Sequence, residues 1–133
     1  MADTENIMER HLEAEGEMDY DYVNDILFFK VKGREYDFSM EFQNMVIDVD
    51  KEKFIVGIQI FDAAEFLDLQ KTDLRSIPKW QFKARIDHGV IEIRLFYQII
   101  VRNRIIEKNP IIIQDNTPRL PAPQMVSTIN SQR

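Results

Sequence analysis

The chain has 133 residues, of which 44% are hydrophobic and 30% charged, so its composition fits one globular domain with a core of its own. It contains no cysteine, which excludes disulfides and thiolate metal sites and leads us to expect a cytoplasmic protein. No apolar stretch approaches the ~18 residues of a membrane span, and the acidic first residues lack the apolar core of a signal peptide.

The net charge of −6 is unevenly distributed along the chain. Residues 1–69 contain 18 acidic and 6 basic side chains, a balance of −12, whereas residues 70–133 contain 5 acidic and 11 basic ones, a balance of +6. The acidic half should attract basic surfaces, and the basic half could approach phosphate or an acidic partner. Ordinary solvated surface is the alternative explanation of the same pattern.

Residues 1–17 are predicted to be an acidic arm or a short helix. In the helical alternative Ile7, Met8 and Leu12 share one side and Gly16 ends the helix. The acidic residues of its later turns oppose the helix dipole, and a helix of this length is marginal by itself.

Residues 18–62 predict five short strands in succession. Tyr36 to Phe42 alternates apolar and polar residues, which is typical of a half-buried strand, whereas Ile26 to Val31 is apolar on both faces and should be central. Polar turns separate the strands at Asn24-Asp25, Gly33-Arg34, Gln43-Asn44 and residues 50–53.

Residues 63–78 predict a short helical connector, because the period of the apolar residues changes after Asp62 and Pro78 stops the second helical turn. Residues 79–114 then predict a second β unit of three strands. His88-Gly89 and residues 102–104 form its turns, and Pro110 should lie at an edge or a bulge.

Residues 115–133 contain three prolines and no periodicity, so we predict a flexible tail. The single β domain therefore spans residues 18–114. We expect a mainly β fold in which antiparallel meanders of five and three strands pack as a sandwich or a curled sheet with one short helix.

The first β unit resembles a family of small bacterial and archaeal proteins, the domain of unknown function number 2283. The opening of the family's pattern matches Tyr20, Asp21, Asp25 and Leu27. The remainder matches Glu41, Val46, Asp48, Asp50, Val56, Gly57, Ile58, Ile60 and Ala63.

This chain departs from the family's pattern at Lys53, where glycine is usual, and at Gln59, where glutamate is usual. The second β unit looks like the extension of longer archaeal members. The resemblance implies a small β fold with one helix and no established activity. Some members look like neighbours of toxin-like small proteins, which makes an antitoxin role conceivable.

No pattern in the sequence predicts catalysis or a metal site, so we expect neither an enzyme nor a cofactor. An EF-hand beginning at Asp48 would need glycine and a bidentate acid where Lys53 and Gln59 stand. Asp19, Asp21 and Asp25 lack a ligand spacing and suit turn hydrogen bonds. Neither histidine belongs to a recognisable triad, no serine has a nucleophile-elbow context, and no glycine-rich phosphate loop occurs.

The basic residues of the second β unit are the candidate partner-binding residues. If Trp80, Phe82, Ala84 and Ile86 point inward, the opposite face carries basic side chains around an aromatic ring, and such a face could take an RNA backbone with one stacked base. Asp87 and Glu92 interrupt this face. The predicted set is Lys83, Arg85, Arg94, Phe96, Arg102 and Arg104.

Large apolar residues on nominally outer faces predict a further contact. They are Phe96, Ile100 and Ile112 in the second unit and Leu27, Phe29 and Val31 in the first. Either a second sheet or another copy of the chain covers them. We expect a non-enzymatic binding or adaptor protein that acts as a homodimer. Its partner would be a ribonucleoprotein such as a ribosomal subunit. The alternatives are an antitoxin-like protein that neutralises a small basic toxin and, least favoured, a carboxylate-based enzyme or metal-binding protein.

Overall fold

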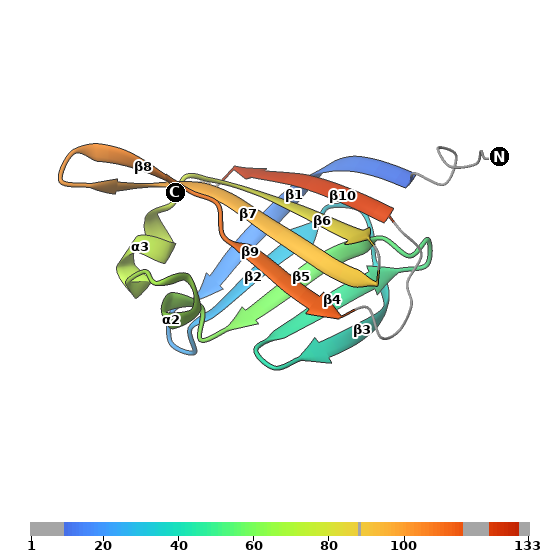
Figure 1. The fold of residues 1–133 in the computed structure, drawn as a ribbon. Coiled ribbons are helices and arrows are strands. Elements are labelled where there is room, and N and C mark those ends of the chain that lie inside the picture. The colour runs from blue at the N-terminus through green and yellow to red at the C-terminus, as the bar shows by residue number, and fades with distance from the viewer. Residues whose placement is uncertain (1–9, 88, 116–122, 131–133) are drawn as a thin grey trace.

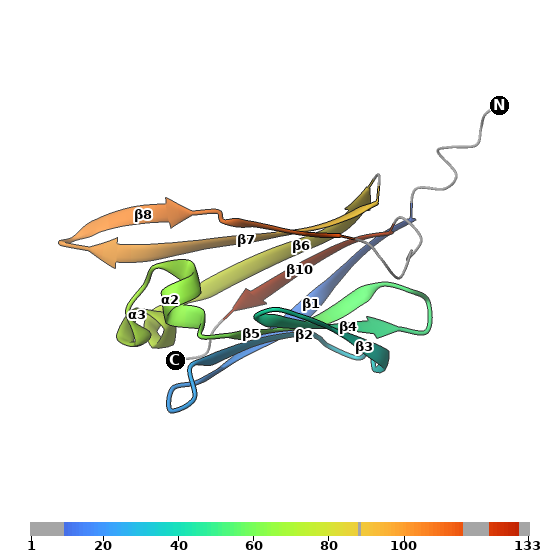
Figure 2. The same cartoon turned by 60° about the horizontal axis from the view of Figure 1, so that its bottom comes forward.

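The computed structural model describes residues 10–87, 89–115 and 123–130. They form ten strands and two short helices, as the sequence predicts for a mainly β protein. The strands make two antiparallel sheets that share one strand and do not close into a barrel, and they face each other as two layers (Figures 1 and 2).

The first sheet contains the five strands predicted for residues 18–62. It runs in the order β3-β4-β5-β2-β1, so the doubly apolar strand β2 is central, as predicted. The bounds are β1 Arg10–Asp21, β2 Ile26–Val31, β3 Tyr36–Phe42, β4 Met45–Asp50 and β5 Ile55–Phe61.

The second sheet contains the predicted second β unit. Its strands are β6 Lys79–Asp87, β7 Val90–Val101, β8 Arg104–Lys108, β9 Ile111–Asp115 and β10 Pro123–Asn130. Strands β8 and β9 both pair with β7 in one continuous register and are separated by Asn109 and Pro110, so the proline lies at an edge as predicted.

Two helices connect the units, where one short helix was expected with a further helical turn. They are α2 Ala63–Leu67 and α3 Lys71–Ser76, and they lie at one end of the space between the two layers (Figure 2). Ala63, Leu67 and Leu74 are their buried residues. No helix in the described parts of the chain is long and apolar enough to cross a membrane.

The structure corrects the sequence prediction at both ends of the chain. Residues 10–17 are the first part of strand β1 rather than a helix or arm, while residues 1–9 lie outside the described residues. Pro123–Asn130 forms strand β10 within the segment predicted to be a flexible tail. These two segments stabilise each other, because Arg10 to Glu15 pairs in parallel with Pro123 to Thr128.

The core lies between the two sheets. Leu27, Phe29 and Val31 point into it and are almost completely buried, so the second sheet covers them and no second copy is needed there. The Phe29 ring centroid lies 5.2 Å from that of Trp80, which in turn lies 4.4 Å from that of Tyr97. Ile112, another nominally outer residue, is also buried.

Tyr97 and Tyr20 give the fold a stability that depends on pH. Burial and, secondarily, the charge of Asp68 raise the pKa of Tyr97 to about 12, and burial with the hydrogen bond to Asp25 raises the pKa of Tyr20 strongly. A tyrosine in the unfolded chain has a pKa near ~10, so the protonated form is favoured by folding. The stabilisation is present below that pH and is lost as the pH rises.

We therefore expect the free energy of unfolding to fall as the pH rises from about 10 to about 12, by on the order of 2–3 kcal/mol from Tyr97 alone. Urea denaturation across this range and tyrosinate absorbance measure the two sides of the linkage. Tyr97→Phe should remove one late-titrating component of the absorbance. A titration in which every tyrosine of the folded protein ionises in one step near ~10 would contradict this account.

Candidate functional site

Two acidic residues of the family's pattern, Asp25 and Asp50, stabilise the fold by accepting hydrogen bonds. Asp25 accepts a hydrogen bond from the Tyr20 hydroxyl at 2.6 Å and from the backbone N–H of Ala64 at 3.0 Å, which fixes the start of α2. Asp25 has a left-handed backbone (φ 57°), a conformation that aspartate tolerates better than most residues.

Asp50 organises the turn between β4 and β5. Its side chain is 6% exposed, and one carboxylate oxygen accepts the backbone N–H groups of Glu52 and Phe54, each at 2.9 Å. The other oxygen accepts from Nε of Arg34 at 2.7 Å, and the same guanidinium also pairs with Glu52. A buried carboxylate with this many partners is a structural group.

The three carboxylates considered for a metal site have separate hydrogen-bond partners. Asp19 accepts from the backbone N–H of Tyr20 at 2.9 Å, and Asp21 accepts from the backbone and side chain of Asn24. The hydrogen bonds from Asn24 lower the pKa of Asp21. Across the described ranges no three His, Cys, Asp or Glu side chains gather as metal ligands would.

We expect Asp25→Ala to lower the free energy of unfolding by roughly 2–4 kcal/mol, because it removes two hydrogen bonds and places alanine in a left-handed conformation. Asp25→Asn keeps an acceptor and tolerates that conformation, so its loss should be smaller. Urea denaturation of both variants measures this. Equal losses would show that the charge, rather than the acceptor and the backbone conformation, dominates at this position.

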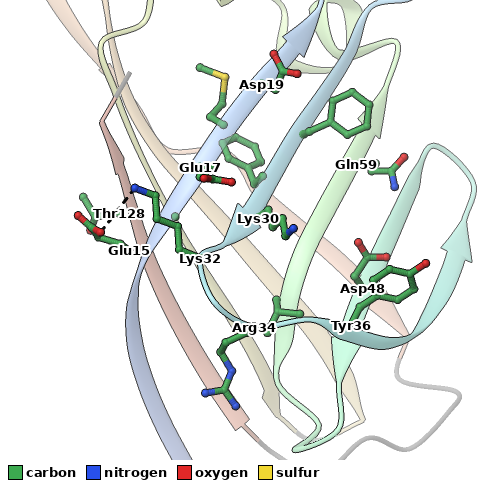
Figure 3. A pocket seen from close by; sticks show the side chains of 15 residues that line it. Glu15, Glu17, Asp19, Lys30, Lys32, Arg34, Tyr36, Asp48, Gln59 and Thr128 are labelled. Atoms are coloured by element: carbon green, nitrogen blue, oxygen red, sulfur yellow. Dashed lines mark ion pairs between the residues drawn. The ribbon is translucent and has the colours of Figure 1, made fainter. Parts of the chain in front are cut away.

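The outer face of the first sheet has a hollow of about 790 Å³ that sequence reasoning missed (Figure 3). Its lining includes Lys30 and Asp48, which lie on either side of Gly57 in the register. A Cβ atom at Gly57 would lie 2.8 Å from Oδ2 of Asp48. The charges lining the hollow are mixed, and Lys32 pairs with Glu15 across 3.7 Å.

The predicted partner-binding residues separate into two groups. Lys83, Arg85, Arg94 and Phe96 share the outer face of β6 and β7, and we call them the basic patch; Lys83 lies directly opposite Arg94 in the register. Arg102 and Arg104 lie instead at the far turn of the β7–β8 hairpin. That turn is eight residues beyond Arg94, which is roughly 26 Å along a strand.

Part of the basic patch is already paired within the chain. Nε of Arg94 lies 2.5 Å from a carboxylate oxygen of Glu92, and Nζ of Lys83 lies 5.5 Å from the centroid of the Phe96 ring. One face of the Phe96 ring therefore already contacts a cation of the chain. The patch is better suited to contact a phosphate backbone than to read bases.

Most of the exposed large apolar side chains among the described residues follow the β7–β8 hairpin and β9, which form one edge of the second sheet. The hairpin projects beyond the helices at one end of the molecule (Figure 1). We call the exposed isoleucines of β8 and β9 the isoleucine edge; they are Ile105 (67% exposed), Ile106 (37%), Ile111 (49%) and Ile113 (56%). Ile100 and Val101 extend the same surface onto β7.

This edge exposes backbone groups as well as side chains. Strand β7 separates β8 and β9 from the remainder of the sheet, so their other side faces no strand among the described residues. An unpaired edge with large apolar side chains is normally avoided or covered, because it favours pairing with another chain. Sequence reasoning identified Ile100 and the buried Ile112 but none of the four residues of the isoleucine edge.

The fold defines a small, open, two-sheet β protein, and comparison with known proteins places it in a family. Residues 17–63 match the model of DUF2283, described as a protein of unknown function. The chain belongs to this family.

Two archaeal relatives extend the similarity beyond the family model. A protein of Methanosarcina mazei named "Putative hypoxanthine phosphoribosyltransferase" is 33% identical over 105 residues, which cover 77% of this chain and 84% of that protein. The "Uncharacterized protein MJ0789" of Methanocaldococcus jannaschii is 27% identical over 101 residues, which cover 75% of this chain and 87% of that protein. No solved structure matches this chain significantly.

Proposed function

We propose that this protein is a non-enzymatic, cytoplasmic binding protein that acts as a homodimer through the isoleucine edge. The observation that carries the proposal is the exposure of Ile105, Ile111 and Ile113 along an unpaired strand. Burial of apolar surface is the main favourable term in association, and these side chains hold apolar area that the chain itself does not cover.

The name of the Methanosarcina relative does not lead us to propose phosphoribosyl transfer. Anionic phosphate groups are commonly held by glycine-rich loops at helix N-termini. This chain has four glycines, and the helices that the structure describes have five and six residues and no glycine at their starts. Phosphoribosyl transfer to hypoxanthine by the purified protein would overturn the non-enzymatic part of the proposal.

The dimer predicts a solution mass of two 15.8 kDa chains at micromolar concentration. Ile105→Asp combined with Ile113→Asp should give a single chain, because association would bury two charges without partners. The single chain should still unfold cooperatively on heating, because both side chains lie outside its own core, although the stability that association adds would be lost. Light scattering after gel filtration and a thermal melt measure the two quantities.

Val23→Asp is the matched control for this experiment. Val23 is 83% exposed in the β1–β2 turn, so the substitution adds one negative charge, half of that in the double variant, to another exposed apolar residue away from the edge. This variant should keep the mass of the wild type. A wild-type mass of one chain would remove the dimer.

The charge distribution favours a ribonucleoprotein, such as a ribosomal subunit, as the further partner. The basic patch and the two arginines of the hairpin turn lie on the second sheet, while the first sheet carries most of the acidic side chains. A partner with both phosphate and basic protein surface suits this arrangement better than naked DNA does. The competing proposal is an antitoxin whose acidic half covers a small basic toxin.

Capture from lysate at low and high salt separates these two partners. Changing Lys83, Arg102 and Arg104 to Glu should abolish recovery of ribosomal components, and recovery by the wild type should weaken with salt. A toxin complex would survive the substitutions. Changing Lys30, Lys32 and Lys51 to Glu gives a control with the same charge change on the first sheet. Recovery of neither partner by the wild type would remove both proposals.

A further inference from the structure

The backbone direction of the edge strand determines how a second copy could pair with it. The N–H of Leu95 donates to the carbonyl oxygen of Pro110 at 3.1 Å, and these residues are opposite each other in the register that joins Arg94 to Ile111 and Tyr97 to Lys108. Residues that exchange hydrogen bonds alternate along an antiparallel pair. The residues whose backbone groups face away from β7 are therefore Ile105, Glu107, Asn109, Ile111 and Ile113.

A two-fold axis restricts the registers that such an edge can adopt with a second copy. In a continuous antiparallel sheet the axis is normal to the sheet, so each side chain stays on its own face. Residues directly opposite each other share a face, and side chains alternate between faces along a strand. The two members of each pair must therefore be an even number of residues apart. The axis then passes midway between one residue and the same residue of the other copy, which we call an axis through that residue.

An axis through Asn109 aligns β8 of each copy with β9 of the other. It places Ile105 opposite Ile113 and Ile106 opposite Ile112, so exposed isoleucines meet isoleucines on both faces. Pairs with like charges do not occur in this register: Arg104 meets Gln114, Glu107 meets Ile111, and Lys108 meets Pro110.

Other registers leave much of the exposed apolar surface uncovered. An axis through Ile112 pairs β9 with its own copy and places no described residue opposite Ile105 or Ile106. An axis through Ile106 pairs β8 with its own copy and places Arg104 opposite Lys108, which repel each other. Of these three axes, the one through Asn109 alone engages both strands along their whole lengths.

We propose that two copies of this protein join their second sheets through reciprocal pairing of β8 with β9, with the two-fold axis at Asn109. This inference rests on the proposed homodimer and specifies its geometry. Each projecting hairpin would lie along the edge of the other copy. Its outer isoleucines would then be next to those of β9, which explains why a projecting hairpin carries so much exposed apolar surface.

Single cysteines test the register, because the wild-type chain contains none. Asn109 is exposed, and on the axis its Cα atom would lie about 5.5 Å from that of its copy, a separation that a disulfide spans. Asn109→Cys should therefore form a covalent dimer under mild oxidation. At micromolar protein the rate should be on the order of 100-fold above that of a chance encounter.

Glu107→Cys is the matched control, since its backbone faces the same edge from two residues away. Its Cα atom would be about 13 Å or more from that of its copy, beyond the reach of a disulfide. Glu107→Cys alone should stay uncrosslinked, while its mixture with Ile111→Cys should crosslink. Rates are read from non-reducing gels.

The outcomes separate the geometry from the dimer itself. Rapid crosslinking of Asn109→Cys but not of Glu107→Cys supports the proposed axis. A protein with the mass of a dimer whose Asn109→Cys variant reacts no faster than Glu107→Cys overturns the register and leaves the homodimer standing. Fast crosslinking by Ile111→Cys alone overturns the register as well. A mass of one chain at every accessible concentration overturns both proposals.

Discussion

The pairing of strand β1 with two different strands is the constraint on which the rest of the structure depends. Up to Glu15 the strand pairs in parallel with β10, and from Gly16 onward it pairs antiparallel with β2. One twelve-residue strand therefore belongs to both sheets and turns one layer over the other. The change of partner occurs at a glycine, which is typical where a strand bends sharply between sheets.

Joining the sheets at β1 determines what is buried and what is exposed. The two layers bury one another's apolar faces, and the rings of Phe29, Trp80 and Tyr97 pack together in the core between them. The second sheet, however, continues into the β7–β8 hairpin, which projects beyond the first sheet (Figure 2). The exposed Ile100, Ile105 and Ile106 of this hairpin lie outside the chain's own core, which is the reason for proposing an intermolecular contact there.

Local patterns in the sequence predicted the elements more successfully than their pairing. The five strands of the first unit, the helical connector and the long β6–β7 hairpin follow from alternation and turn residues, which are encoded within a few positions. Pairing between Arg10 and Pro123 joins segments more than a hundred residues apart, and no short pattern reports it.

The sequence of strand β1 does contain the alternation of apolar and polar residues that predicts a strand. Leu12, Ala14, Met18 and Tyr20 alternate with acidic residues, with Gly16 in the same row, which is the pattern of a half-buried strand. The density of glutamate and the small size of alanine and glycine instead favoured an arm or helix. For the candidate site, the sequence identified the basic patch but not the isoleucine edge, because exposure depends on how far the opposite layer extends.

If the second sheets join as proposed, the dimer brings the basic surfaces of the two copies together and keeps their acidic surfaces apart. Pairing at Asn109 would make one continuous sheet from the two basic outer faces and leave the acidic first sheets at a distance from the axis. Lys83 and Arg94 of both copies would then share one surface, so a partner that contacts many phosphates would gain from both copies at once. A basic toxin would instead meet two separated acidic sheets. The dimer geometry thus favours one extended anionic partner over two small basic ones.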